Sequence, residues 1–135
     1  MPKRAAMGVA GRLLETVGLA DSATLPAARL TVAGARRLEL ARALAAGPRV
    51  LILDEILAGM SHGELAVGLE ILLRLKDSAM TMVVVEHRMA AVKVLCDEVL
   101  VLARGTVVRK GPPGSVLTDP KVVRAYLGGP PGDMP

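Results

Sequence analysis

Two pairs of polar residues directly follow two apolar runs in this 135-residue chain, and their side chains are of types that can bind a metal ion or transfer a proton. Asp54 and Glu55 follow the first run, and Glu86 and His87 follow the second. Successive side chains of an extended chain point to opposite sides, so one carboxylate could hold Mg²⁺ while its neighbour polarises a water molecule. A nearby histidine could donate a hydrogen bond to a phosphoryl oxygen. The same residues also suit an ordinary strand end followed by a loop, and composition alone leaves both interpretations open.

The two apolar runs are typical of neighbouring strands in a parallel sheet. Residues 50–53 and 81–85 lack the polar alternation of a half-solvated strand, which predicts burial on both faces. Between them, residues 63–76 carry leucines at helical spacing. The order strand, helix, strand predicts a parallel crossover and an α/β fold. Ligands bind outside the carboxyl ends of such strands, which is where both polar pairs fall.

Further helices and a hairpin are expected in the rest of the chain. The other expected helices cover residues 6–17, 34–46, 89–96, 112–117 and 120–127. Residues 20–29 contain several turn formers and are expected to form a connecting loop. Residues 99–102 and 106–108 flank Arg104 and Gly105, which predicts a tight hairpin.

Composition excludes several classes of protein. Hydrophobic residues make up 52% of the chain, enough for a buried core, whereas aromatic residues make up 1%, which excludes the stacking platforms of RNA-recognition sheets. Cys96 is the single cysteine, so a disulfide framework is excluded and a reducing compartment is expected. The net charge of +4 is spread along the chain and does not favour a nucleic-acid partner. Neither a secretory signal nor a membrane-spanning run of ~18 apolar residues is expected.

The order of these segments resembles the second half of the nucleotide-binding domain of ABC transporters, of the branched-chain amino-acid type. The most specific part is residues 36–44, then Pro48 and residues 50–55, which look like the signature helix running into the Walker B strand. The further matches are residues 58–60 with the D-loop, residues 83–87 with the H-loop strand and residues 111–127 with the closing helices.

This resemblance implies a fold and a division of the chain. The implied fold is a partial P-loop NTPase-like, RecA-like parallel sheet with flanking helices and part of a helical subdomain, without the Walker A half. Residues 1–46 would be the remnant of the helical subdomain with the signature helix. Residues 47–127 would be the C-terminal half of the RecA-like core, with Walker B, D-loop and H-loop. Residues 128–135, rich in glycine and proline, would be a flexible tail.

The resemblance also implies residue roles, with ATP and Mg²⁺ as cofactors. Asp54 would coordinate Mg²⁺, Glu55 would be the catalytic base, and His87 would be the switch histidine that senses the γ-phosphate. The expected nucleotide-contacting residues are Thr31, Ala33 and Gly34 of the signature, facing ATP held by the opposite subunit, and Ala58, Gly59, Met60 and Ser61 of the D-loop. The implied partners are a second nucleotide-binding domain and membrane-spanning permease subunits. The chain would then lie at the cytoplasmic face of the membrane, without inserting into it and without a nucleic-acid partner.

Three features depart from the family pattern. The signature has Thr31 in place of serine, and Ala33 stands at its glycine position with Gly34 one place later. Ile56 replaces the proline that usually follows the catalytic glutamate. The sequence also contains no Gly-x-x-x-x-Gly-Lys-Ser/Thr motif, the loop whose backbone amides and lysine hold phosphates.

Two functions from different classes remain open from the sequence. The first is the C-terminal portion of an ABC-transporter ATPase subunit that couples ATP hydrolysis to import of branched-chain amino acids or similar solutes. The alternative is a truncated or degenerate relative that hydrolyses nothing and acts as an interaction module. Without a phosphate-binding loop the chain is expected to be inactive alone, and parallel strands without neighbours predict marginal stability. A small basic regulator of nucleic acid is a third possibility, against which the resemblance argues.

Overall fold

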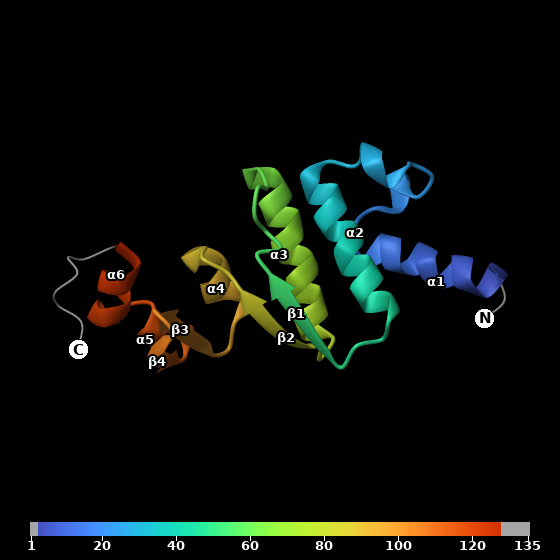
Figure 1. Cartoon of the computed structure of the whole chain (residues 1–135). Coiled ribbons are helices and arrows are strands. Elements are labelled where there is room, and N and C mark those ends of the chain that lie inside the picture. The colour runs from blue at the N-terminus through green and yellow to red at the C-terminus, as the bar shows by residue number, and fades with distance from the viewer. Residues whose placement is uncertain (1–2, 128–135) are drawn as a thin grey trace. The chain divides into compact units, whose positions relative to one another are not determined.

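The computed structural model describes residues 3–127, which divide between Glu86 and His87 into two compact units (Figure 1). The first unit contains α1 (Lys3–Thr16), the 3-10 turns η1 (Ala20–Ser22) and η2 (Ala27–Arg29), α2 (Val32–Ala45), β1 (Val50–Asp54), α3 (His62–Asp77) and β2 (Thr81–Val85). The second unit contains α4 (Met89–Leu95), β3 (Val99–Ala103), β4 (Thr106–Gly111), α5 (Pro113–Val116) and α6 (Pro120–Leu127). The predicted tail, residues 128–135, lies outside the described residues.

A two-stranded parallel sheet forms the centre of the first unit. β1 and β2 pair in register from Val50 opposite Thr81 to Asp54 opposite Val85. The helix α3 connects the two strands and runs alongside them in Figure 1. This arrangement confirms the predicted strand–helix–strand crossover, and it places the carboxyl ends of both strands at one edge.

The prediction that both strands are buried on both faces is wrong. Burial alternates along β1, where Leu51 and Leu53 are buried while Ile52 between them is 71% exposed. The exposed apolar residues on the open face are Val50, Ile52, Val83 and Val85. A continuous apolar run indicates that both faces of a strand avoid water in the folded protein, but the described residues cover only one face of this sheet.

The first two long helices pack on each other through the turn that joins α1 to the rest of the unit. Val17 and Leu19, on either side of Gly18, are buried. Arg37 of α2 donates from Nη1 to the Gly18 carbonyl at 3.0 Å and from Nε to the Ala33 carbonyl at 3.4 Å. The expected loop over residues 20–29 contains the turns η1 and η2, because short i→i+3 hydrogen bonds satisfy backbone groups where the chain reverses.

In the second unit the predicted hairpin is present and longer than expected. β3 and β4 pair antiparallel from Ala103 opposite Thr106 to Val99 opposite Gly111. Arg104 (φ 50°) and Gly105 (φ 77°) both adopt left-handed backbone conformations, which is the geometry of a two-residue type I′ turn. The short helices α5 and α6 follow, close to the predicted ranges. Among the helices of residues 3–127, none combines the length and apolar character needed to cross a membrane.

Candidate functional site

Asp54 ends β1 at the carboxyl edge of the sheet, where its backbone lies opposite Val85. Its side chain is exposed and makes no hydrogen bond or ion pair with any other residue in the range 3–127. A carboxylate in this state keeps its oxygen lone pairs available for a cation. The position and the chemistry of Asp54 therefore suit a metal-binding role.

Glu55 follows in a backbone conformation that is uncommon for a residue with a side chain. Its φ is 46°, in the left-handed region, which costs of order 1–3 kcal/mol for a non-glycine residue. The conformation is held by two hydrogen bonds, from the Glu55 N–H to the Val85 carbonyl at 2.9 Å and from the Ala58 N–H to the Glu55 carbonyl at 2.9 Å. The chain thus turns sharply directly after the strand, so Glu55 does not continue the alternation of β1.

Leu57 anchors this turn in the hydrophobic core. Its side chain is 1% exposed. A Cβ atom added to Gly68 of α3 would lie 2.9 Å from Cδ2 of Leu57, so the absence of a side chain at Gly68 allows this close approach. Leu57 thereby fixes the segment between Glu55 and the start of α3 against the helix.

The segment after Leu57 runs beside the start of α2. Gly59 has φ 72°, and a Cβ atom at this position would lie 3.7 Å from Cγ1 of Val32, the first residue of α2. Thr31 caps α2, because its Oγ1 accepts a hydrogen bond from the Gly34 N–H at 3.1 Å. The structure therefore brings the predicted D-loop residues next to the predicted signature residues.

Ser61 and Glu64 form a reciprocal capping box at the start of α3. Glu64 Oε2 accepts from the Ser61 N–H at 3.0 Å and from the Ser61 hydroxyl at 2.8 Å, while the Glu64 N–H donates to Ser61 Oγ at 3.4 Å. The backbone and side-chain hydrogen bonds from Ser61 lower the pKa of the Glu64 carboxyl below its usual value. Desolvation opposes this shift by less than the Ser61 hydrogen bonds contribute, and a hydrogen bond from Thr31 and the positive charge of Arg37 lower the pKa further by still smaller amounts.

The predicted signature and D-loop residues differ in what they offer at the surface. Ala33, Gly34 and Met60 are buried. Thr31 and Ser61 are exposed, and each already uses its hydroxyl oxygen to cap a helix. Among the predicted signature and D-loop residues, Thr31 and Ser61 are therefore the ones that present polar side-chain atoms to solvent.

His87 is the first residue of the second unit. It precedes α4, and its residue is exposed. Its backbone carbonyl accepts a hydrogen bond from the hydroxyl of Tyr126, in α6. The structure thus brings Asp54, Glu55 and residues 58–61 together within the first unit, and it fixes the backbone of His87 within the second.

Known proteins that resemble this chain in sequence include ATP-binding proteins of amino-acid transporters. No protein-family model matches the chain. It is 35% identical over 124 residues to the high-affinity branched-chain amino acid transport ATP-binding protein LivG of Escherichia coli, covering 91% of this chain and 49% of that protein. It is 34% identical over 127 residues to BraF of Pseudomonas aeruginosa, a protein of the same description, covering 93% of this chain and 50% of BraF. The chain spans about half the length of the relatives it matches.

Solved structures agree with the sequence relatives. The ADP conformation of an ATP-binding cassette of an ABC transporter matches with a TM-score of 0.81 at 29% identity, over 90% of this chain and 50% of that one. The chain corresponds to the C-terminal half of an ABC-transporter nucleotide-binding domain. A nucleotide-free cassette from an ABC transporter also matches this half-domain, with a TM-score of 0.82 at 28% identity.

The part of the chain that the structure describes contains no cluster that would hold a metal ion by itself. Within residues 3–127, no three His, Cys, Asp or Glu side chains are arranged as a metal site. A nucleotide-bound Mg²⁺ ion needs only one or two protein carboxylates, because phosphate oxygens and water complete its octahedron. The exposed Asp54 carboxylate, beside Glu55, fits this second kind of site.

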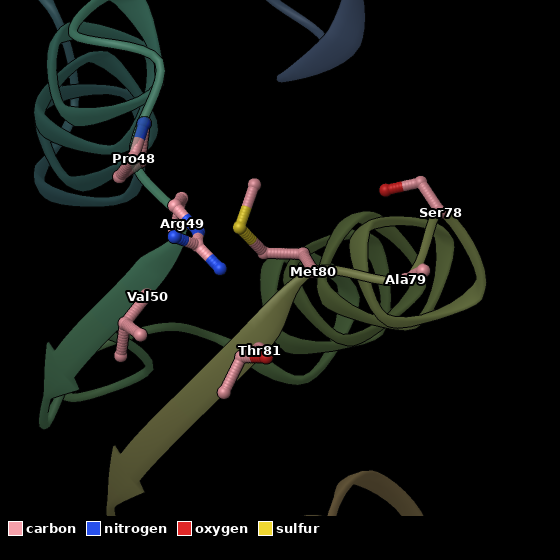
Figure 2. A pocket seen from close by; sticks show the side chains of 7 residues that line it. All are labelled: Pro48, Arg49, Val50, Ser78, Ala79, Met80 and Thr81. Atoms are coloured by element: carbon pink, nitrogen blue, oxygen red, sulfur yellow. The ribbon is translucent and has the colours of Figure 1, made fainter.

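A hollow of about 600 Å³ lies at the opposite edge of the same sheet. It is lined by residues 48–50 and 78–81, at the amino ends of β1 and β2. Figure 2 shows the Arg49 and Met80 side chains projecting toward each other across the space between the two strands. Parallel sheets bind ligands at the carboxyl ends of their strands, so the edge that carries Asp54 and Glu55, and not this hollow, is the candidate ligand site.

Several residues of the site were not identified from sequence. The Ser61-x-x-Glu64 spacing is a capping-box signal that could have placed the start of α3 and explained Ser61. The sequence marks Glu86 only as a polar residue at a strand end, yet its Oε1 accepts a hydrogen bond from the Leu57 N–H at 3.3 Å. The contact between Tyr126 and His87 joins residues 39 apart in sequence and has no local signal.

Proposed function

We propose that this chain is the C-terminal portion of an ABC-transporter ATPase subunit that couples ATP hydrolysis to import of branched-chain amino acids or similar solutes. The observation that carries the proposal is the pair Asp54 and Glu55, one an exposed carboxylate at the carboxyl edge of a parallel sheet and the next in a left-handed turn. The branched-chain amino-acid transport described for LivG and BraF supports the solute class.

Each residue of the pair has a separate task in phosphoryl transfer. Asp54 would hold Mg²⁺, which supplies charge neutralisation at the phosphate oxygens when nucleotide is bound. The carboxylate of Glu55 would accept a proton from the attacking water and orient that water toward the γ-phosphate. His87 would donate a hydrogen bond to a γ-phosphate oxygen, which positions the transferred group and stabilises its charge.

The starts of α2 and α3 are proposed to face a second nucleotide-binding domain. The Thr31 and Ser61 hydroxyls are exposed there, and they lie at two helix N-termini that are neighbours in the first unit. Helix N-termini favour negative charge, so both suit the phosphates of ATP held by the opposite domain. Closure of the two nucleotide-binding domains on ATP would be transmitted to permease subunits in the membrane. The chain would bind these subunits at their cytoplasmic side.

A reconstitution experiment tests this function. The purified chain is assayed for Mg-ATP hydrolysis alone and after addition of a P-loop-bearing segment from a branched-chain amino-acid transport ATPase. We expect hydrolysis only in the mixture, and Glu55→Gln should lower its kcat by about 10²-fold or more. Glu70→Gln is the matched control, because Glu70 is exposed and forms an ion pair with Arg74 of the same helix. Hydrolysis that is unchanged in Glu55→Gln would refute the assignment of the base.

An interaction module is the second candidate, and the open sheet face favours it. Ile52 and its apolar neighbours on β1 and β2 remain exposed within the described residues. Exposed apolar surface of this kind marks a place where another polypeptide packs. If the mixture with the P-loop-bearing segment forms a stable complex but does not hydrolyse ATP, the interaction module replaces the ATPase as the function.

A further inference from the structure

Glu86 makes a contact that the roles proposed above leave unexplained. Its Oε1 accepts a hydrogen bond from the Leu57 N–H at 3.3 Å, across 29 positions in the sequence. Its Oε2 is buried and has no hydrogen-bond partner among residues 3–127. A buried carboxylate oxygen without a partner costs free energy, so stability alone does not account for a glutamate at this position.

The hydrogen bond ties the turn after β1 to the end of β2 at a second point. The Glu55 N–H already donates to the carbonyl of Val85, at 2.9 Å. Two residues further along the turn, the Leu57 N–H donates to the side chain of Glu86, the residue after Val85. The consecutive residues Val85 and Glu86 therefore hold the turn by accepting hydrogen bonds from the residues on either side of Ile56.

The residue held by this double attachment is Glu55. Its φ of 46° is unfavourable for a side-chain-bearing residue and persists only when surrounding contacts impose it. Leu57 supplies one such contact through its buried side chain against Gly68, and the Leu57 amide supplies another through Glu86. Loss of the acceptor at Glu86 would leave the amide end of Leu57 without its bond and loosen the turn.

We infer that Glu86 is a positioning residue that holds the Glu55–Leu57 turn, and with it the carboxylate of Glu55, through the hydrogen bond from the Leu57 amide. The inference rests on the proposed function for its link to catalysis, but not for the hydrogen bond itself. Glu86 acts through the backbone of the turn and is not assigned a contact with nucleotide.

Two neutral variants of similar length test the role of the acceptor. Glu86→Gln keeps a side-chain carbonyl that can accept from the Leu57 N–H, whereas Glu86→Met keeps the length without a strong acceptor. In the full 135-residue chain, we expect hydrogen exchange of the Leu57 amide to accelerate about 10-fold or more in Glu86→Met and to stay within about 3-fold in Glu86→Gln. Glu86→Ala serves as a second acceptor-free variant if Glu86→Met does not fold, and Glu70→Ala is the surface control.

The second readout is kcat and KM in the mixture with the P-loop-bearing segment. We expect Glu86→Met to lower kcat about 10-fold with KM for ATP nearly unchanged, and Glu86→Gln to restore most of the rate. Equal exchange rates in Glu86→Met and the unmodified chain, or equal acceleration in Glu86→Met and Glu86→Gln, would overturn the inference. Accelerated exchange with an unchanged kcat would overturn the link to Glu55. If no variant and not even the unmodified chain hydrolyses ATP, the proposed function fails while the exchange rates still decide the role of Glu86.

Discussion

The hydroxyl of Tyr126 donates a hydrogen bond to the backbone carbonyl of His87, 39 residues earlier in the chain. Tyr126 is the single aromatic residue of the sequence and is 49% exposed, so its ring contributes little to the core. Its specific contribution is to connect α6 to the residue that begins the second unit. The closing helix thereby restrains the backbone beside the proposed switch histidine.

Removal of this hydroxyl should weaken the docking of α6. We expect Tyr126→Phe to lower the free energy of unfolding of the second unit by about 0.5–1.5 kcal/mol, the net value of one hydrogen bond. The measurement is denaturant unfolding together with hydrogen exchange of the α6 amides. Val123→Ala, an exposed substitution in the same helix, is the control and should change stability by less than about 0.5 kcal/mol. Equal effects of the two substitutions would contradict a specific role for the hydroxyl.

Gly68 and Gly63 of α3 should respond oppositely to alanine. A Cβ atom at Gly68 would lie 2.9 Å from the buried Leu57 side chain, and overpacking of this kind costs about 1–3 kcal/mol. A Cβ atom at Gly63 has no neighbour within 4 Å. Gly63→Ala should therefore raise the free energy of unfolding by up to about 1 kcal/mol, because alanine has a higher helix propensity than glycine. Thermal unfolding of both variants checks the prediction. A stabilising Gly68→Ala would show that the Leu57 side chain moves aside easily.

The type and order of the elements could be predicted because they depend on local patterns. Leucines at helical spacing predicted α3, and two apolar runs predicted β1 and β2. The same apolar runs did not reveal that Ile52 is exposed, since periodicity reports which faces avoid water and not which segment covers them. Arg104 and Gly105 marked the hairpin turn correctly because the turn chemistry is contained in two adjacent residues.

The candidate site could be located from sequence but not assembled. The carboxylates Asp54 and Glu55 stood out as a pair after an apolar run. The left-handed backbone of Glu55 has no signal in its residue type, because glutamate has no preference for positive φ. Two acceptors hold this turn, the Val85 carbonyl and the Glu86 carboxylate. They are about 30 positions away in the sequence and come close to the turn only because β2 pairs with β1.

The capping box at Ser61 should make the stability of α3 depend on pH. The pKa of Glu64 in the folded chain lies below its ordinary value of 4.5, so the ionised carboxylate stabilises the fold above that value. This stability is lost as the pH falls through the lowered pKa, because the unfolded chain then binds the proton more readily. We expect Glu64→Gln to flatten the dependence of the denaturation midpoint on pH between about pH 6 and pH 3. An unchanged pH dependence in Glu64→Gln would remove Glu64 as the source.

Loss of the Ser61 hydroxyl should affect the same helix start. Ser61→Ala removes both the acceptor for the Glu64 N–H and the donor to Glu64 Oε2, and should cost about 0.5–2 kcal/mol. Ser61→Thr keeps both functions of the hydroxyl and is the matched control. The measurement is denaturant unfolding above pH 6, where the carboxylate is ionised. A threonine variant as unstable as the alanine variant would point to a steric effect and not to the cap.

Neighbouring residues of β1 should reveal whether the open sheet face is covered in solution. Leu53 is 3% exposed, so Leu53→Ala should cost about 2–5 kcal/mol of unfolding free energy. Ile52, one residue earlier and 71% exposed, should tolerate Ile52→Thr with a change below about 0.5 kcal/mol. The two variants are compared by denaturant unfolding at low protein concentration, with light scattering to follow association. A cost for Ile52→Thr that approaches that of Leu53→Ala, or that appears only at high concentration, would mean that a polypeptide covers this face, because an isolated exposed isoleucine has no buried contacts to lose.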